Sequence, residues 1–277
     1  MNKFLLRTFT GAIYVLLIVG CVLWGGLIGF TILCCVLTLL GMIEFLRMTK
    51  GGGERTMLTS ALDILIGLSL TLSLFLSRGS QLSLTVILAE IAFLILLRAV
   101  MELYTGSSRP ATDIALSALS VIYVAAPLTI ATYVDILAGA ECLMLIFVMI
   151  WLNDTGAFLV GSAIGRHKLF ERLSPKKSWE GFWGGAAFCV IAGWLAKLIF
   201  PSIFILPAGC YIGLGLVVCL FSTWGDLFES MIKRSAGVKD SGNILPGHGG
   251  ILDRIDSLLF VMPASAIYLF ILIYSLR

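Results

Sequence analysis

The ionisable side chains of this chain are concentrated in one stretch, residues 230–256, which reads SMIKRSAGVKDSGNILPGHGGILDRID. It combines carboxylates, lysines, arginines, a histidine and several glycines, although only 13% of the whole chain is charged. The residues that follow, 257–276, are again almost entirely apolar. Charged residues at the end of an apolar membrane helix cost free energy, and they commonly mark functional sites. We therefore expect the chemistry of this protein to involve this stretch.

Carboxylates form the first candidate set. Asp253 and Asp256 are three residues apart, so they share one face of a helix that begins near residue 252. Asp226 falls near the end of the expected span 206–228, and Asp154 lies within the expected span 141–162. Oxygen ligands suit Mg²⁺, which commonly binds one or two carboxylates together with substrate phosphates. We predict a metal site with these ligands: Asp226 and Asp253 first, then Asp256 and Asp154. The alternative is that each aspartate caps a helix or pairs with a nearby arginine.

Basic residues form the second set. Lysine and arginine bind phosphate, the first as a point charge and the second as a planar fork. We predict a phosphate-binding role for the basic residues that lie among glycines, serines and carboxylates: Lys176, Lys177, Lys233, Arg234 and Lys239. Arg166, Lys168 and Arg172 are interpreted instead as charges that set membrane orientation and attract anionic lipid.

Small and polar residues beside these charges complete the candidate site. Glycines in the turn His248-Gly249-Gly250 let backbone amides approach an anion closely. His248 lies five residues before Asp253, and for this histidine a structural role and a substrate contact both remain open. Ser178 and Asp240 are expected to orient the bound phosphates. The chain contains no GxxxxGK[ST] phosphate loop.

The elements that must position these residues are membrane helices. Of the 277 residues, 59% are hydrophobic and the mean hydropathy is +1.05, far above the values of soluble domains. Windows of 18 or more apolar residues are long enough to cross a bilayer. We predict an all-α, polytopic membrane helix bundle with nine spans: 8–24, 26–46, 58–77, 82–104, 113–133, 141–162, 179–200, 206–228 and 257–276.

The distribution of basic residues predicts the orientation of these spans. With nine spans and a cytoplasmic N-terminus, 16 of the 19 lysines and arginines face the cytoplasm. The polar loops 163–178 and 229–256 then lie on the same cytoplasmic face. We expect residues 1–140 to be a scaffold with dimer contacts, and residues 141–277 to be the catalytic region.

Charged residues in the first five spans receive a structural interpretation. We expect packing, ion pairing or dimer contacts for Glu44, Asp63, Glu90, Arg98 and Glu102. The seven cysteines lie in or beside apolar runs and form no ligand pattern, so they are interpreted as reduced, space-filling residues.

The polar motifs resemble those of the CDP-diacylglycerol synthases, also called phosphatidate cytidylyltransferases. The family pattern is a serine, Lys-Arg, Lys-Asp, His-Gly-Gly and Asp-Arg-x-Asp, which this chain matches at Ser230, Lys233-Arg234, Lys239-Asp240, His248-Gly249-Gly250 and Asp253-Arg254-Ile255-Asp256. The stretches 153–158 (NDTGAF) and 174–181 (SPKKSWEG) are also similar to family elements. The resemblance is strong over about residues 150–260, whereas the first 140 residues are similar only in being hydrophobic.

The resemblance implies the reaction CTP + phosphatidate → CDP-diacylglycerol + pyrophosphate, a step of phospholipid biosynthesis. It implies Mg²⁺ as cofactor and allows a monovalent cation such as K⁺. It further implies a homodimer in the inner (cytoplasmic) membrane whose active site faces the cytoplasm, with membrane lipids as neighbours and no nucleic-acid partner. Asp226, Lys233, Arg234, Asp253 and Asp256 would be the catalytic residues.

Two other functions stay open. A CTP-dependent polyprenol or phytol kinase would share the membrane, the nucleotide and the metal, although the full motif from Lys233 to Asp256 argues against it. A transporter would usually place its ion site near the membrane midplane and in inverted repeats. This sequence shows no internal repeat, and its polar residues cluster at one face.

Overall fold

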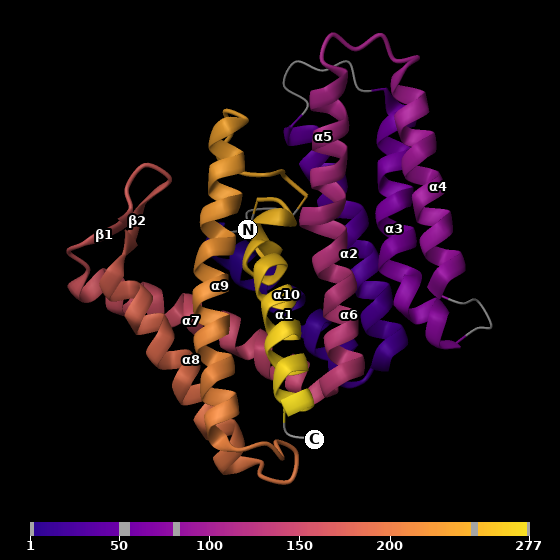
Figure 1. The fold of residues 1–277 in the computed structure, drawn as a ribbon. Helices are drawn as coiled ribbons and strands as arrows, with labels where there is room; N and C mark the ends of the chain where they lie inside the picture. Colours follow the sequence, from indigo (N-terminus) through magenta and orange to yellow (C-terminus); the bar gives the residue numbers. More distant parts are fainter. Residues whose placement is uncertain (1–2, 50–55, 80–83, 245–248, 276–277) are drawn as a thin grey trace. The chain divides into compact units, whose positions relative to one another are not determined.

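Each of the nine expected spans coincides with helical structure in the computed structural model, which describes residues 3–49, 56–79, 84–244 and 249–275 (Figure 1). The helices are α1 (Lys3–Leu23), α2 (Gly26–Met48), α3 (Met57–Gly79), α4 (Leu84–Glu102), α5 (Pro110–Ser120), the π-helical turn η1 (Val121–Ala125), α6 (Ala126–Ala138), α7 (Ala140–Ile164), α8 (Trp179–Ile199), α9 (Ala208–Ser235) and α10 (Leu252–Ser275). α5, η1 and α6 run on without a break and together correspond to the expected fifth span.

Seven helical segments within the described residues are long and apolar enough to cross a membrane. They are α2, most of α3, the continuous α5–η1–α6, α7, α8, α9 and α10. Their number and apolar character confirm a polytopic helical membrane protein. The total of nine spans and the cytoplasmic N-terminus remain predictions.

The chain divides into two compact units. The first contains residues 1–133 together with 236–254, and the second contains residues 134–235 together with 255–277. The segment 236–254, which carries Lys239, Asp240 and Asp253, therefore groups with the N-terminal helices and not with the helices around it in sequence. The expected division into a scaffold and a catalytic region remains a prediction about function.

In the first unit, α2 and α3 lie at the centre of the packing. Leu62, Ile66, Ile87 and Ile91 form an apolar cluster where α3 meets α4. The same unit buries a polar network around Arg98, which pairs with Asp63 at 2.9 Å and Glu102 at 2.6 Å. The expected pairing role of these three residues is confirmed, because buried charges are tolerated when they are paired and hydrogen-bonded.

In the second unit, α7, α8 and α9 pack against one another, and α10 lies along α9. Two hydrogen bonds join the last two helices. Ser257 Oγ donates to the Ser222 carbonyl at 3.3 Å, and the Tyr268 hydroxyl donates to the Cys210 carbonyl at 2.9 Å. The first of these bonds places Ser257, near the start of α10, beside Ser222 of α9, one turn before Asp226.

Two local features differ from the expected loops. The loop 163–178 contains an antiparallel hairpin of β1 (Lys168–Phe170) and β2 (Ser174–Ser178), in which Lys168 is opposite Ser178. α9 continues to Ser235, so the first residues of the expected loop 229–256 are helical. The helix continues because its backbone bonds remain favourable outside the apolar span, and hydropathy marks only the membrane-embedded part of a helix.

Candidate active site

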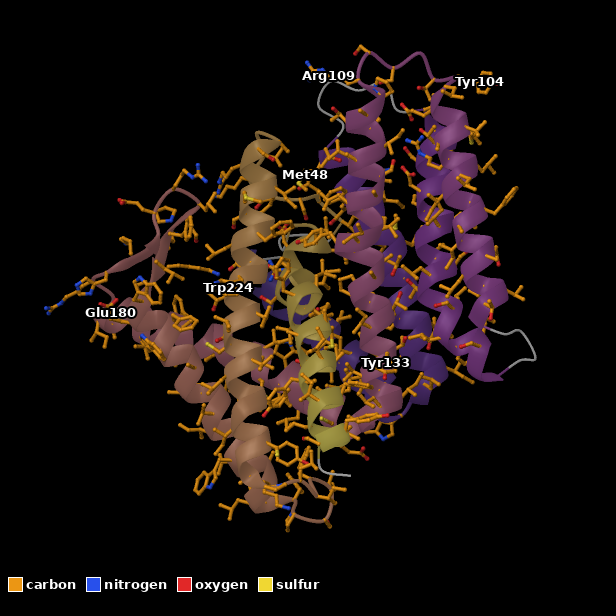
Figure 2. The ribbon with its side chains drawn as sticks, in the orientation of Figure 1. Met48, Tyr104, Arg109, Tyr133, Glu180 and Trp224 are labelled. Carbon is orange, nitrogen blue, oxygen red and sulfur yellow. The ribbon has the colours of Figure 1, made fainter. Side chains whose placement is uncertain are left out.

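The hairpin is attached to the start of α8 through Glu180, which is labelled in Figure 2. Glu180 Oε1 lies 2.6 Å from His167 Nδ1, and the Arg166 amide donates to Glu180 Oε2 at 3.1 Å. At the same helix start, the Gly181 amide donates to Ser178 Oγ at 3.2 Å. Ser178 is therefore the N-cap of α8, a role that satisfies one of the free amides of the first turn.

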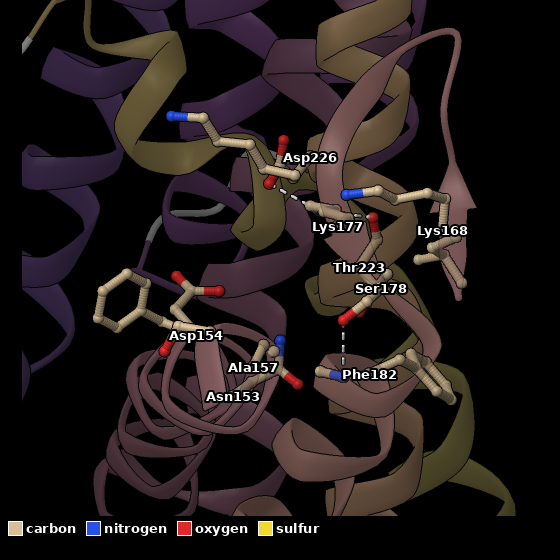
Figure 3. A pocket seen from close by; sticks show the side chains of 15 residues that line it. Asn153, Asp154, Ala157, Lys168, Lys177, Ser178, Phe182, Thr223 and Asp226 are labelled. Atoms are coloured by element: carbon tan, nitrogen blue, oxygen red, sulfur yellow. Dashed lines mark hydrogen bonds and ion pairs between the residues drawn. The ribbon is translucent and has the colours of Figure 1, made fainter. Parts of the chain in front are cut away.

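A cavity of about 530 Å³ opens between this hairpin and helices α7, α8 and α9 (Figure 3). Its wall combines small and apolar residues with polar ones. The polar side chains are Asn153, Asp154, Ser162, Lys168, Lys176, Lys177, Ser178, Thr223 and Asp226. Concave sites of this size and mixed lining are typical of small-molecule binding.

An ion pair lies at the wall of this cavity. Lys177 Nζ is 2.7 Å from Asp226 Oδ2, and it also donates to the Thr223 carbonyl at 3.4 Å (Figure 3). Both side chains are partly exposed, so the pair remains accessible to a ligand. Lys168 and Lys176 are exposed and have no ion-pair partner among the described residues. The cavity thus offers three cationic groups to an anionic ligand.

The carboxylate of Asp256 belongs to the same electrostatic environment. It lies within range of the charges of Asp226, Asp154 and Lys177, and its Oδ1 accepts a 2.6 Å hydrogen bond from the Ser257 amide. Gly225 permits this arrangement, because a Cβ at that position would lie 2.6 Å from the Asp256 carbonyl oxygen. The sequence predicted a cation site of Asp226 and Asp253 with Asp256 and Asp154. The grouping described here contains Asp226, Asp256 and Asp154, and their metal-binding role remains a prediction.

The donor set of these aspartates fits a hard divalent cation. Asp226 and Asp256 are like charges held within electrostatic range of each other, which a bound cation would offset. Among the described residues, no group of three or more histidine, cysteine, aspartate or glutamate side chains lies close enough together to hold a metal ion. Mg²⁺ does not require such a group, since it commonly uses one or two carboxylates and takes its other ligands from water and phosphate.

Asp253 lies in the first unit and is held by a turn of the segment 236–254. Its Oδ2 accepts hydrogen bonds from the Ser241 amide at 3.0 Å, the Ser241 hydroxyl at 3.0 Å and the Gly250 amide at 2.8 Å. Gly249 has a φ of +81°, which strongly favours glycine, and a Cβ there would lie 2.7 Å from Asp253 Oδ2. The glycines of the motif thus let the backbone close around this carboxylate.

The remaining candidate residues are distributed as follows. Lys233 and Arg234 lie in the last turn of α9, where Lys233 Nζ pairs with the buried Glu229 at 2.6 Å. Lys239 and Asp240 are exposed in the segment after α9, and Asp240 lines a second hollow with Arg47. His248 lies outside the described residues, so both interpretations of this histidine stay open.

Four polar residues of the cavity wall were not among the predicted site residues. They are Asn153, Ser162, Thr223 and Lys168, of which Lys168 had been interpreted as an orientation charge. For Asn153 a signal was present, because it begins the NDTGAF stretch. For Lys168 the sequence contained no such signal, because its position at the cavity depends on the pairing of β1 with β2.

Comparison with known proteins identifies the family and several relatives of this chain. The profile of the Cytidylyltransferase family matches residues 5–272. A protein of Staphylococcus aureus (strain COL) named phosphatidate cytidylyltransferase is 50% identical over 125 residues, which are 45% of this chain and 47% of that protein. Proteins with the same name from Staphylococcus saprophyticus and Staphylococcus epidermidis are 45% and 44% identical over 125 and 127 residues, with the same coverage. These alignments span about half the length of the relatives.

Proposed function

This chain belongs to the Cytidylyltransferase family, and from that premise we propose that it is a phosphatidate cytidylyltransferase that converts CTP and phosphatidate into CDP-diacylglycerol and pyrophosphate. The observation that carries the proposal is the cavity in which Lys168, Lys176 and the Lys177–Asp226 pair lie together. Both substrates are polyanions, and a site for them needs cations and accessible carboxylates in one place. The name of the Staphylococcus relatives supports the choice of phosphatidate as acceptor.

The reaction joins two anions, so repulsion is the first obstacle. An oxygen of the lipid phosphate attacks the α-phosphorus of CTP, a new P–O bond forms, and the bond to the pyrophosphate leaving group breaks. Lys177 would neutralise charge at the reacting phosphate and on the leaving group, while Lys176 and Lys168 would offset the charge of the bound substrates. A general base is not required, because phosphatidate is already ionised at neutral pH.

Asp226 and Asp253 would hold a Mg²⁺ ion, with Asp256 and Asp154 contributing directly or through water. When bound, this ion would supply Lewis-acid polarisation of the phosphoryl oxygens. Lys233, Arg234 and Lys239 would bind further phosphate oxygens, while Ser178, Asp240, His248, Gly249 and Gly250 would orient them. Lys177 also holds Asp226 in place through its 2.7 Å pair.

The setting follows from the substrates. Phosphatidate resides in the membrane and CTP in the cytoplasm, so we propose the inner membrane as location and a cytoplasmic active site. A homodimer and a second, monovalent cation such as K⁺ belong to the same proposal.

The deciding experiment measures pyrophosphate release by the purified protein in detergent with CTP, phosphatidate and Mg²⁺, each omitted in turn. We expect release only when all three are present, together with a CDP-lipid product. A folded protein that instead phosphorylates dolichol or phytol would be a lipid kinase. Transport of a solute in proteoliposomes without CTP consumption would make it a transporter.

A further inference from the structure

Glu44 on α2 is almost fully buried, with 2% of its surface exposed, yet it contacts a segment about 200 residues later in the chain. The Leu252 amide donates to Glu44 Oε2 at 2.9 Å, and the Ser241 hydroxyl lies 3.2 Å from the same oxygen. All these residues belong to the first unit. Burying a carboxylate is costly unless it is hydrogen-bonded, so these contacts indicate a specific role.

The groups that Glu44 holds are those that surround Asp253. The Ser241 hydroxyl lies between the two carboxylates, 3.2 Å from Glu44 Oε2 and 3.0 Å from Asp253 Oδ2. Leu252, whose amide donates to Glu44, directly precedes Asp253. Glu44 is therefore linked to Asp253 through one side chain and through the first residue of α10.

Gly242 and Gly250 lie close to the carboxylate of Glu44. A Cβ on Gly242 would lie 2.5 Å from Glu44 Oε1, and a Cβ on Gly250 would collide with Oε2 and with the Ser241 hydroxyl. Glu44 Oε1 has no hydrogen-bond partner within the part of the chain that the structure describes. Such an atom lowers stability, so simple packing does not account for a glutamate here.

We propose that Glu44 is a positioning residue for Asp253: its Oε2 fixes Ser241 and the start of α10, and these fix the Asp253 carboxylate. The inference deepens the proposed function and rests on it for the catalytic role of Asp253. It also assigns a part of α2, in the region expected to be scaffold, to the positioning of a catalytic group.

The first test compares Glu44→Ala with Glu44→Gln in the Mg²⁺-dependent assay. A glutamine oxygen can accept the same two hydrogen bonds, so Glu44→Gln should keep most of the wild-type kcat. Glu44→Ala should lower kcat by about 100-fold, as expected for a displaced catalytic group, and raise the Mg²⁺ concentration needed for half-maximal activity, while KM for CTP changes little. Ser241→Ala should combine with Glu44→Ala non-additively, because both act through Asp253.

Asp63→Asn is the matched control, since Asp63 is another buried carboxylate of the same unit whose partners are Arg98 and Ser117. It should lower thermal stability without changing the Mg²⁺ requirement of the folded fraction. If Glu44→Ala behaves in the same way as Asp63→Asn, Glu44 is only a structural residue and the proposal is overturned.

A second readout does not depend on activity. The Ser241 and Gly250 amides donate to Asp253, so hydrogen–deuterium exchange in peptides covering 241–253 should be faster in Glu44→Ala than in Glu44→Gln or Asp63→Asn. Unchanged exchange would overturn the proposal. If the wild-type protein forms no CDP-lipid, the proposed function fails, whereas this exchange comparison still decides whether Glu44 fixes the groups around Asp253.

Discussion

At the scale of single residues, the candidate carboxylates and cations of each unit are held by specific partners. Lys177 pairs with Asp226, and Asp253 accepts three hydrogen bonds from Ser241 and Gly250. Charge-assisted hydrogen bonds of this kind hold side chains more firmly than neutral ones do. The candidate groups are therefore positioned before a substrate arrives, which would lower the reorganisation needed during the proposed cytidylyl transfer.

Replacing Asp253 by asparagine should abolish most of the activity. The amide oxygen can still accept hydrogen bonds from Ser241 and Gly250, so the fold is retained, but the negative charge for a cation is lost. We expect kcat to fall by about 10²–10³-fold, which corresponds to several kcal/mol of lost charge stabilisation. Pyrophosphate release, measured alongside gel filtration in detergent, checks this. Activity close to wild type in a folded variant would remove Asp253 from the metal assignment.

Lys177 and Lys168 line the same cavity but should differ in importance. Lys177 is paired with Asp226, whereas Lys168 is an exposed residue of the hairpin. Lys177→Met should lower kcat by about 10²–10³-fold, a typical cost for one preorganised charge at the reacting centre. Lys168→Met should raise KM for one of the substrates and leave kcat nearly unchanged. Steady-state kinetics with each substrate varied separately will show which substrate each lysine helps to bind. Equal effects of the two variants on kcat would contradict this prediction.

At the scale of elements, close helix packing brings Asp226 of α9 and Asp256 of α10 within electrostatic range of each other. Gly225 is in contact with the backbone of α10 at Asp256, and the helices can approach only because no side chain intervenes. Small residues at membrane helix interfaces have this function in general. The hairpin contributes differently, since it places Lys168, Lys176 and Lys177 over the start of α8.

A pair of alanine substitutions within α9 tests this packing. Gly225→Ala should destabilise the protein by about 1–3 kcal/mol, because the added methyl group would meet the rigid backbone at Asp256. Gly209→Ala is the matched control, since nothing lies within 4 Å of its added Cβ. Thermal inactivation in detergent should show a loss for the first and no loss for the second. Equal stability of the two variants would mean that α9 and α10 do not pack this closely.

At the scale of the whole molecule, the orientation in the membrane decides which substrate can reach the cavity. The predicted topology places the hairpin in the cytoplasm and residues 200–207 on the opposite face, separated by α8. This helix has 21 residues, and at about 1.5 Å per residue it is long enough to cross the hydrocarbon core. A site that uses cytoplasmic CTP requires the hairpin side to be cytoplasmic.

Single cysteines at the two ends of α8 test this topology. In a cysteine-free background, Glu171→Cys in the hairpin should react with an impermeant maleimide only in inside-out vesicles. Ser202→Cys should react only in right-side-out vesicles or intact spheroplasts. Both positions are exposed, so burial does not limit labelling. Labelling of both from the same side would refute the span count in this half of the chain.

The sequence alone was sufficient to predict the helices and the chemical class of the site. Long apolar runs predicted the membrane helices, because a bilayer demands about 20 apolar residues per span whatever the neighbouring helices do. The motif from Ser230 to Asp256 likewise predicted carboxylates and cations for phosphate chemistry. These properties are local, so they can be read from neighbouring residues.

Only the tertiary structure determined which residues act on one another. Lys177 pairs with Asp226, which lies 49 residues later in the sequence, and Glu44 accepts a hydrogen bond from Leu252, which lies 208 residues later. The hairpin that places Lys168 at the cavity was also missed, because three- and five-residue strands are too short to leave a periodic pattern. For Glu44 the sequence predicted packing, ion pairing or dimer contacts without naming a partner. The partners of a buried carboxylate are set by helix packing between distant parts of the chain, which hydropathy does not show.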